Sequence, residues 1–472
     1  MPANGRFEKE VAAGKPTGVV SALDRFLVTV KGLRGVTIGS LVVFESGQKG
    51  MVREVEGGHV TVLNIDRTSP AIGSLAVVAE RELAIPVGEG LIGRVVDPFG
   101  QPLDGKGQIQ HVGTHPAFFP APSIAERSML QDQLPTGVSI VDSLFPIVLG
   151  QRIAVLGDSK SGKTSFLLQM GAQQAGTDRV VVYVLIGKRR VDVDKIIGTL
   201  RDTGALEHSI VVVASIFDSL AQSYIAPYAG CAMAEYLWHG GRDVVIVYDD
   251  LASHAKAYRE ISLLAKANPG RESYPGDMFY AHSSLLERAG KLAKNEKTLT
   301  ALPVVITPGD DITANLPTSI MSITDGQIIF DLEHFRQNIR PAVNIGLSVS
   351  RVGGRAQNAR QKSLTSKLFK LLSEYRQTRE FAHFASEMSM ESKRLLTLGD
   401  QLYETFRQAP AERFTLDEQL LMFETLMKAG GVSSMNIALL KQRARELAAE
   451  DGVDNEATLD TLLKDTAVEA VT

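Results

Sequence analysis

The chain begins with a region of short apolar runs that are interrupted at close spacing by Gly, Asp and Ser. Such punctuation is typical of strands joined by turns. The runs between residues 17 and 83 are Gly18–Leu23, Phe26–Val30, Ser40–Phe44, Gly50–Val55, His59–Leu63 and Leu75–Val78. Many short strands with turn signals predict a small β-barrel or a sandwich in this region.

A second pattern extends from about residue 137 to residue 345, where apolar runs alternate with segments of helical spacing. The clearest runs are Ile153–Leu156, Val180–Ile186, Ile210–Ala214, Val244–Tyr248 and Leu302–Ile306. These runs are continuously Val- and Ile-rich, which indicates strands buried on both faces. We therefore predict a parallel sheet covered by helices.

A third pattern covers residues 361–450, which lack strand-like runs and show helical spacing in Leu368–Tyr375, Met390–Phe406 and Leu416–Met427. This spacing predicts a helical domain. The tail Ala448–Thr472 is acidic and rich in small residues, and it fits either a short helix or a frayed end. The expected organisation is a multi-domain α/β chain with boundaries at 1–83, 84–357 and 358–472.

Composition narrows the classes of partner. The 472 residues include 50 Lys and Arg against 54 Asp and Glu, a net charge of −4, so no basic field favours nucleic acid. The single cysteine, Cys231, excludes an internal disulfide and fits a reducing compartment. The N-terminus lacks the apolar core of a signal peptide, and no apolar stretch approaches the ~20 residues of a membrane span. We therefore expect a cytoplasmic chain that reaches a membrane only through partners.

The strongest chemical signal is Gly157–Thr164, which reads GDSKSGKT and matches the phosphate-loop pattern GxxxxGK[ST]. A strand-like run precedes it, and the amphipathic segment Ser165–Gln174 follows it. Glycines let backbone N–H groups approach phosphate, and the helix N-terminus adds partial positive charge. Lys163 is expected to reach the β- and γ-phosphates and Thr164 to ligate Mg²⁺. The expected nucleotide contacts are Gly157, Asp158, Ser159, Lys160, Ser161, Gly162, Lys163, Thr164 and Ser165.

A second nucleotide signal is the apolar run Val244–Tyr248, which ends in Asp249 and Asp250. A strand that ends in an acid downstream of a phosphate loop is the Walker B arrangement, in which the carboxylate holds Mg²⁺. Asp249 directly ends the run and is the predicted metal residue. An Asp at this place can also simply cap the next helix.

Together with further segments, these motifs resemble the alpha subunit of F-type ATP synthases, and the resemblance covers nearly the whole chain. The matching segments are Pro135–Ile147, Gly157-Asp158, Ala226–Tyr236, Tyr248–Leu251, Pro269–Asp277, Leu285–Ala289, Ser322–Gln327, Ile339–Ala342 and Ser348–Gly354. The resemblance implies an N-terminal β-barrel, a RecA-like nucleotide domain with helices on both faces of its sheet, and a C-terminal helical bundle. It also implies ATP or ADP with Mg²⁺ as the bound ligands.

The resemblance further implies a division of labour between two similar subunits. Beta subunits carry a Glu after the third strand that positions the attacking water, whereas alpha subunits bind nucleotide without turning it over. This chain has Lys188 at that position. Lys188 cannot accept a proton as a carboxylate does, so we expect no hydrolysis at this chain's own site.

Arg351 matches the family's arginine that reaches the neighbouring beta subunit and stabilises charge on the γ-phosphate. It sits where a strand of the sheet is expected to end. Ser322 and Gly326 are expected to line the same interface. An ordinary interfacial salt bridge is the alternative role for Arg351.

Several departures from the family surround this chain's own nucleotide. Ser159 and Lys160 replace the usual Arg and Gln, and Ile306 replaces the usual Glu after Pro303–Val305. Lys188 stands in place of a Gln. In the expected adenine pocket Gln408 is retained, but Pro410 replaces the second Gln of a Gln-x-Gln pair. These changes leave open which nucleotide the site holds. The short N-terminus likewise leaves open the contact with the peripheral stalk.

The implied partners are a beta-type catalytic subunit in an alternating hexamer, a central-stalk gamma-type subunit and a peripheral-stalk delta-type subunit. The membrane rotor is reached only indirectly, at the cytoplasmic face of the plasma membrane, and no nucleic acid is expected. The activity implied is proton-driven ATP synthesis or ATP hydrolysis by an H⁺-transporting two-sector ATPase. Two alternatives remain: an autonomous hexameric ATPase of the protein-export or RNA-helicase type, and an alpha-like subunit of altered or regulatory purpose.

Overall fold

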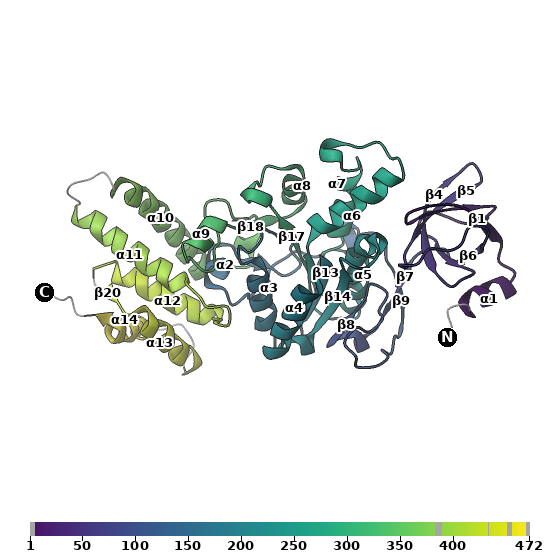
Figure 1. Ribbon diagram of the computed structural model, residues 1–472. Coiled ribbons are helices and arrows are strands. Elements are labelled where there is room, and N and C mark those ends of the chain that lie inside the picture. The colour runs from purple at the N-terminus through teal and green to yellow at the C-terminus, as the bar shows by residue number, and fades with distance from the viewer. Residues whose placement is uncertain (1–4, 383–388, 433, 451–455, 469–472) are drawn as a thin grey trace. The chain divides into compact units, whose positions relative to one another are not determined.

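The structure is a computed structural model that describes residues 5–382, 389–432, 434–450 and 456–468. The chain forms two compact units. The first comprises residues up to 128 together with 175–306 and 313–324, and the second comprises 129–174, 307–312 and the chain from 325 onward. Figure 1 labels the elements of both units, which are described separately here.

The first unit opens with a closed barrel of six antiparallel strands in the order β1-β2-β5-β4-β3-β6. Its strands are β1 (Thr17–Asp24), β2 (Leu27–Lys31), β3 (Leu41–Phe44), β4 (Lys49–Glu56), β5 (His59–Asn64) and β6 (Leu75–Glu80). Buried Val residues and Phe44 fill the interior, and helix α1 (Gly5–Ala12) packs against β6. All six predicted strands are therefore confirmed, and they form a barrel and not a sandwich.

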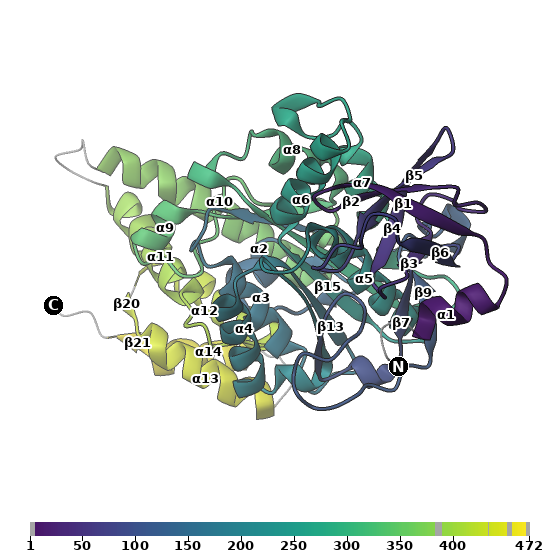
Figure 2. The ribbon, with the colours of Figure 1, turned by 45° about the vertical axis from the view of Figure 1, so that its right-hand side comes forward.

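Parallel strands form the centre of the first unit, in the order β17-β15-β13-β14-β8. They are β8 (Arg94–Val96), β13 (Val180–Lys188), β14 (Ser209–Ser215), β15 (Val244–Asp249) and β17 (Thr298–Ile306), and the short β16 (Gly290–Lys291) pairs antiparallel with β17. Helices α4 (Arg190–Asp202), α5 (Leu220–His239) and α6 (Leu251–Leu264) pack against these strands, as Figure 2 shows. The unit also contains the pair β7 (Ala84–Val87) and β9 (Gly113–Pro116), with α7 (Met278–Leu286) and α8 (Asn315–Ile323).

Two histidines join α6 to α7 inside the first unit. His254 Nδ1 lies 3.0 Å from His282 Nε2, and neither side chain is exposed to solvent. The ring of His254 also stacks on Tyr224 of α5, with their centroids 5.5 Å apart. Burial lowers the pKa of His254 well below its usual range and that of His282 to about 4. Both imidazoles are therefore neutral at neutral pH.

The second unit contains its own small group of strands. Strand β12 (Ala154–Gly157) pairs in parallel with β18 (Gly326–Phe330), and β18 pairs antiparallel with β19 (Val349–Ser350). The predicted parallel arrangement therefore carries antiparallel strands as well. Helix α3 (Lys163–Gln173) follows β12, and the remaining elements near it are β10 (Gln133–Leu134), α2 (Ser139–Leu144), β11 (Ile147–Val148) and α9 (Leu332–Arg336).

The rest of the second unit is helical, as the spacing predicts. Its helices are α10 (Ala359–Ala382), α11 (Met390–Phe406), α12 (Leu416–Ala429), α13 (Ile437–Glu450) and α14 (Glu456–Thr466). Helix α11 coincides with the predicted segment. The acidic tail contains a short helix, α14, followed by β21 (Ala467–Val468), which pairs with β20 (Ser434–Met435).

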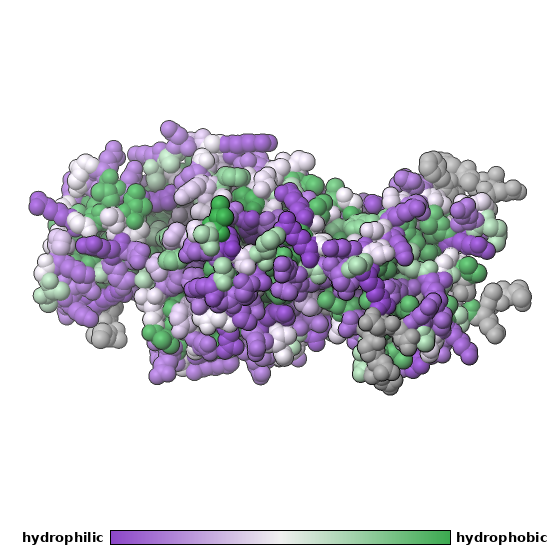
Figure 3. Space-filling view, turned by 180° about the vertical axis from the view of Figure 1, so that it is seen from behind, coloured by the Kyte–Doolittle hydropathy of each residue, from purple (hydrophilic) through white to green (hydrophobic). Residues whose placement is uncertain are grey.

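Hydrophilic side chains predominate on the face shown in Figure 3, and hydrophobic residues are scattered among them. Scattered apolar residues are normal on protein surfaces. Among the described helices, none has both the length and the apolar character that a membrane crossing requires.

Candidate nucleotide site

The phosphate loop connects β12 to α3, and two glycines shape its turn. Gly157 has φ 147°, and a Cβ there would lie 2.4 Å from the carbonyl oxygen of Phe330. Gly162 has φ 105° and is the N-cap of α3, where no side chain caps the first turn. The N–H groups of that turn are thus kept clear of a capping side chain, as an anion site at a helix N-terminus requires.

Lys163 is buried at the start of α3, and its ammonium is directed at the loop itself. Nζ donates to the carbonyl oxygens of Gly157 at 2.8 Å and Asp158 at 2.6 Å, and to the hydroxyl of Ser161 at 3.3 Å. The loop therefore surrounds the ammonium with oxygen atoms. The remaining predicted contacts Ser159, Lys160, Thr164 and Ser165 are exposed, and Lys160 has a left-handed φ of 65°.

Residues 307–312 are joined to the phosphate loop by hydrogen bonds. The N–H of Thr307 donates to Gly157 O at 3.1 Å, and the N–H of Asp158 donates to Asp310 Oδ1 at 3.2 Å. In return, the N–H of Gly309 donates to Asp158 Oδ2 at 2.9 Å. Asp310 lies about 150 residues along the chain from the loop, and no motif in the sequence points to it.

A cavity of about 150 Å³ opens beside the N-terminus of α3. Sites that enclose a whole small molecule measure roughly 300–1,000 Å³, so this cavity fits one ring system and not a complete nucleotide. The guanidinium of Arg340 lies 4.8 Å from the ring centroid of Phe335 in its wall. The lining residues are Gly162, Ser165, Phe166, Gln169, Phe330, Phe335, Arg340, Pro341, Ala342, Gln408 and Pro410.

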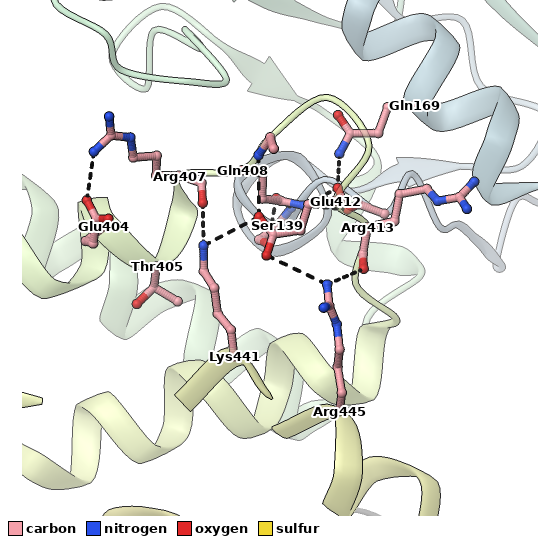
Figure 4. Close-up of polar contacts among 12 residues, drawn as sticks. Ser139, Gln169, Glu404, Thr405, Arg407, Gln408, Glu412, Arg413, Lys441 and Arg445 are labelled. Carbon is pink, nitrogen blue, oxygen red and sulfur yellow. Dashed lines mark hydrogen bonds and ion pairs between the residues drawn. The ribbon is translucent and has the colours of Figure 1, made fainter. Parts of the chain in front are cut away.

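Gln408 borders this cavity, but its amide is fully engaged by the protein (Figure 4). Oε1 accepts from the N–H and the hydroxyl of Ser139 at 2.7 and 2.8 Å. Nε2 donates to Gly137 O at 2.9 Å and to Glu412 O at 3.1 Å. Since an amide oxygen has two lone pairs and an NH₂ group has two protons, these four bonds use its whole capacity. The prediction that Gln408 binds nucleotide stays untested, but any contact would be one of packing.

The loop that carries Pro410 is held by long side chains from two other helices, as Figure 4 shows. Gln169 of α3 donates to Glu412 O. From α13, Lys441 donates to Arg407 O, and Arg445 donates to Arg413 O at 3.3 Å. Burial lowers the pKa of Lys441, although Glu412 opposes that effect. The cavity thus has a fixed wall on the side of residues 407–415.

In the first unit, Lys188 and Asp249 form an ion pair at the ends of adjacent parallel strands. Lys188 Nζ lies 2.7 Å from Asp249 Oδ1 and 3.5 Å from Asp250 Oδ2. Burial alone would lower the pKa of Lys188, but the two carboxylates raise it above its usual range. Asp250 in turn is the N-cap of α6 and accepts from the N–H of Ser253 at 2.6 Å. Lys188 is therefore protonated, and its ammonium pairs with the carboxylates of Asp249 and Asp250.

Gly326 and Arg351 both lie in the second unit, where β18 pairs with β19. Gly326 is the register partner of Ser350, and a Cβ on Gly326 would lie 2.4 Å from Val349 O. The N–H of Arg351 donates to Asp325 O at 3.0 Å, and Arg351 as a residue is exposed. Ser322 belongs to the first unit, where its exposed hydroxyl donates to Thr318 O at 2.8 Å within α8.

Comparison with known proteins decides the family. Residues 137–350 match the model of the ATP synthase alpha/beta family, nucleotide-binding domain, and residues 357–470 match the model of the ATP synthase alpha/beta chain, C-terminal domain. The chain belongs to the ATP synthase alpha/beta family. The structure agrees, since a closed barrel, central parallel strands with helices and a helical C-terminal region are the architecture that the resemblance implies.

Curated relatives place the similarity on the alpha side of the ATP synthase alpha/beta family. ATP synthase subunit alpha of Caldanaerobacter subterraneus subsp. tengcongensis is 42% identical over 404 residues, which cover 85% of this chain and 80% of the relative. ATP synthase subunit alpha of Clostridium botulinum strain Eklund 17B is 40% identical over 445 residues, or 94% of this chain and 88% of the relative. The resemblance to an F-type alpha subunit is therefore confirmed.

Proposed function

We propose that this chain is a nucleotide-binding subunit that does not hydrolyse ATP itself and that serves an adjacent catalytic subunit in a rotary ATP synthase. Membership of the ATP synthase alpha/beta family supports the assembly, and the names of the curated relatives support the alpha-type role. The expected neighbours are a beta-type catalytic subunit, a gamma-type central stalk and a delta-type peripheral stalk. The chain would be peripheral to the membrane and attached through those partners.

The observation that carries the non-catalytic role is the state of Lys188. A residue that activates water must accept a proton or orient the water with an acceptor oxygen. Lys188 has no acceptor atom in its charged form, and its ammonium is held 2.7 Å from Asp249. A deprotonated Lys188 would have to leave two carboxylates that raise its pKa. This position therefore supplies positive charge and no base.

The phosphate loop supports nucleotide binding. Lys163, the uncapped first turn of α3 and the two glycines with left-handed φ supply the cation and the N–H donors that phosphate needs. The 150 Å³ cavity beside Gly162 is the candidate for the base, because it is the apolar space next to the helix N-terminus. Its walls offer Phe335, Pro341 and Pro410 as packing surfaces.

Arg351 is the proposed contribution to the partner's chemistry. The residue is exposed, while its backbone is held by Asp325 and by the pairing of β18 with β19. An exposed arginine on a fixed backbone suits a residue that acts on a neighbouring chain, because the planar guanidinium fork engages phosphate oxygens with little reorganisation. Ser322 and Gly326 are proposed to belong to the same subunit interface.

The test is ATP turnover by the purified chain, alone and with a beta-type subunit. We expect the homogeneous chain to bind fluorescent ATP but to hydrolyse ATP far below about 1 s⁻¹, the lower end of ordinary enzyme rates. Turnover should appear only when the partner is added. Hydrolysis at an enzyme-like rate by the isolated chain would overturn the proposal and favour an autonomous hexameric ATPase.

A further inference from the structure

The end of strand β15 is the place where the family expectation and the structure disagree. Asp249 is the last residue of β15 and is the predicted ligand of Mg²⁺. Its side chain is only 6% exposed, and Lys188 Nζ lies 2.7 Å from Oδ1. Lys188 comes from β13, the parallel neighbour of β15, where Leu185 is the register partner of Asp249. The lysine thus reaches Asp249 from the adjacent strand end.

The second carboxylate at this point is also occupied. Asp250 is 2% exposed in its side chain, its Oδ1 accepts from the N–H of Ser253 at 2.6 Å, and its Oδ2 accepts from the Ser253 hydroxyl at 3.2 Å. The same Oδ2 lies 3.5 Å from Lys188 Nζ. These contacts fix Asp250 as the cap of α6 and as a second anchor of the ammonium.

The strand on the other side of β15 brings no replacement ligand. β17 runs parallel to β15, with Pro303 as the register partner of Tyr248, and it ends at Ile306. An isoleucine offers no oxygen to a hard cation such as Mg²⁺, which prefers carboxylate, carbonyl and water oxygens. In the described part of the chain, no group of three or more His, Cys, Asp or Glu side chains is arranged to hold a metal ion.

A divalent cation does not fit this arrangement. A Mg²⁺ ion that used Asp249, directly or through water, would stand within a few ångströms of the Lys188 ammonium, and two cations at such a distance repel each other strongly in a largely buried site. The charge of the Asp249 carboxylate, which would attract the metal, is already compensated by Lys188, a cation that is covalently part of the chain.

We propose that Lys188 takes the place of the divalent cation at Asp249, so that this chain binds its nucleotide without Mg²⁺. The inference rests on the proposed function, because it presupposes that the phosphate loop holds a nucleotide. It deepens that function by assigning the metal-free nucleotide as the ligand. A nucleotide held in this way would also lack the metal that phosphoryl transfer normally uses.

The experiment measures the metal dependence of nucleotide binding by the full chain. Fluorescent ATP is titrated in excess EDTA and in excess Mg²⁺, with wild type, Lys188→Gln and Arg189→Gln. Gln keeps much of the length of Lys188 but removes the charge. Arg189 is the matched control, since its side chain is 73% exposed and pairs with Asp192 instead of Asp249.

For wild type and Arg189→Gln we expect the two dissociation constants to agree within about threefold. For Lys188→Gln we expect binding at least about tenfold tighter with Mg²⁺ than with EDTA, which corresponds to about 1.4 kcal/mol. Metal analysis of the protein–nucleotide complex, isolated by gel filtration in Mg²⁺ buffer, gives a second readout. Wild type should retain nucleotide without stoichiometric magnesium, and Lys188→Gln should retain both.

The results distinguish failure of this inference from failure of the proposed function. Wild-type binding that needs Mg²⁺, or equimolar magnesium in the wild-type complex, would overturn this inference and leave the proposed function intact. A folded wild-type chain that binds no nucleotide in either buffer would overturn both. If Lys188→Gln does not fold, the two wild-type measurements decide alone.

Discussion

At the scale of single residues, we expect Lys163 to contribute most to nucleotide binding by the phosphate loop. Its ammonium contacts Gly157 O, Asp158 O and the Ser161 hydroxyl, and a phosphate would add charged oxygens to this set. We predict that Lys163→Ala weakens nucleotide binding by about 1.5–3 kcal/mol, because a charge-assisted contact is lost. Fluorescent-nucleotide titration measures the change.

Lys160→Ala is the matched control for this prediction, since Lys160 lies in the same loop with an exposed side chain. Its effect should be clearly smaller. Equal affinities of wild type and Lys163→Ala, at equal melting temperatures, would mean that the loop does not read phosphate through this lysine.

The sequence predicts the strand, loop and helix around residues 157–164 well, because the glycines and the lysine have to occupy fixed positions along a continuous segment, whereas their contacts with nucleotide stay a prediction. It predicts much less about partners that are distant in the chain. The amide oxygen of Gln408 accepts a hydrogen bond from Ser139, 269 residues away in the chain. The carboxylate of Asp310 likewise accepts from the N–H of Asp158 across 152 residues. Lys188 is recognisable as a missing carboxylate, but its pairing with Asp249 follows from the register of β13 and β15, which no local pattern specifies.

At the scale of elements, the pairing of β18 with β19 fixes the backbone before Arg351. A Cβ at position 326 would lie 2.4 Å from Val349 O and 3.1 Å from Ser350 Cα, closer than packed atoms approach. We predict that Gly326→Ala displaces β19 and lowers ATP turnover by the assembled complex at least about tenfold, since small misplacements of catalytic groups are costly. Steady-state ATPase rates of the reconstituted complex measure it.

Gly354→Ala is the control, because a Cβ at position 354 would meet no atom within 4 Å. It should leave turnover near the wild-type rate. A Gly326→Ala complex that assembles normally and turns over normally would show that this strand pair does not govern the position of Arg351.

The buried histidine pair between α6 and α7 is expected to make the stability of the first unit depend on pH. Burial lowers the pKa of His282 from 6.5 to about 4, so the unfolded chain binds a proton in this interval that the folded chain does not. The free energy of unfolding should therefore fall as pH drops from about 6.5 to about 4, with His282 alone contributing on the order of 3 kcal/mol. Urea titrations across this interval measure the effect.

Burial raises the pKa of Asp142 to about 6, so this residue makes the free energy of unfolding rise as pH falls, opposite to His282. The effect of the histidine pair is therefore isolated by comparing variants. The double variant His254→Gln and His282→Gln should lose most of the acid destabilisation, whereas His59→Gln, on the exposed end of β5, should retain it. Identical pH dependence in wild type and the double variant would contradict the prediction.

Periodicity predicts long elements better than short ones. Helix α11 and the barrel strands can be predicted from the sequence. The helix spans several turns of apolar periodicity, and each strand is an apolar run bounded by turn residues. Strands β8 and β18 cannot be predicted in this way, because β8 has only three residues in a Gly- and Pro-rich region and β18 begins with a glycine that its close packing requires. The division of the chain into three domains stays a prediction.

At the scale of the whole molecule, the chain is expected to act through a neighbour. We predict that Arg351→Ala leaves assembly and nucleotide binding at Lys163 largely intact but lowers turnover by the complex by about 10³–10⁵, because such an arginine meets charge that develops mainly in the transition state. Gel filtration and ATPase rates on the same reconstituted sample measure both properties.

Arg355→Ala is a suitable control, since Arg355 is also exposed and lies four residues further along. If Arg351 has only a structural role, its replacement by Ala should loosen the hexamer. Activity should then fall in proportion to the amount of complex that is lost. Intact hexamers with near-normal turnover would exclude Arg351 as the arginine that acts in trans.

The closed barrel of β1–β6 has a consequence for how this chain meets other chains. Each of its strands is hydrogen-bonded on both sides, so the barrel offers no free backbone edge to which a foreign strand could add. Whatever the barrel touches must be recognised by side chains and turns alone. Those positions can diverge without disturbing the backbone hydrogen bonds, so partner choice at this end of the chain can evolve independently of the fold.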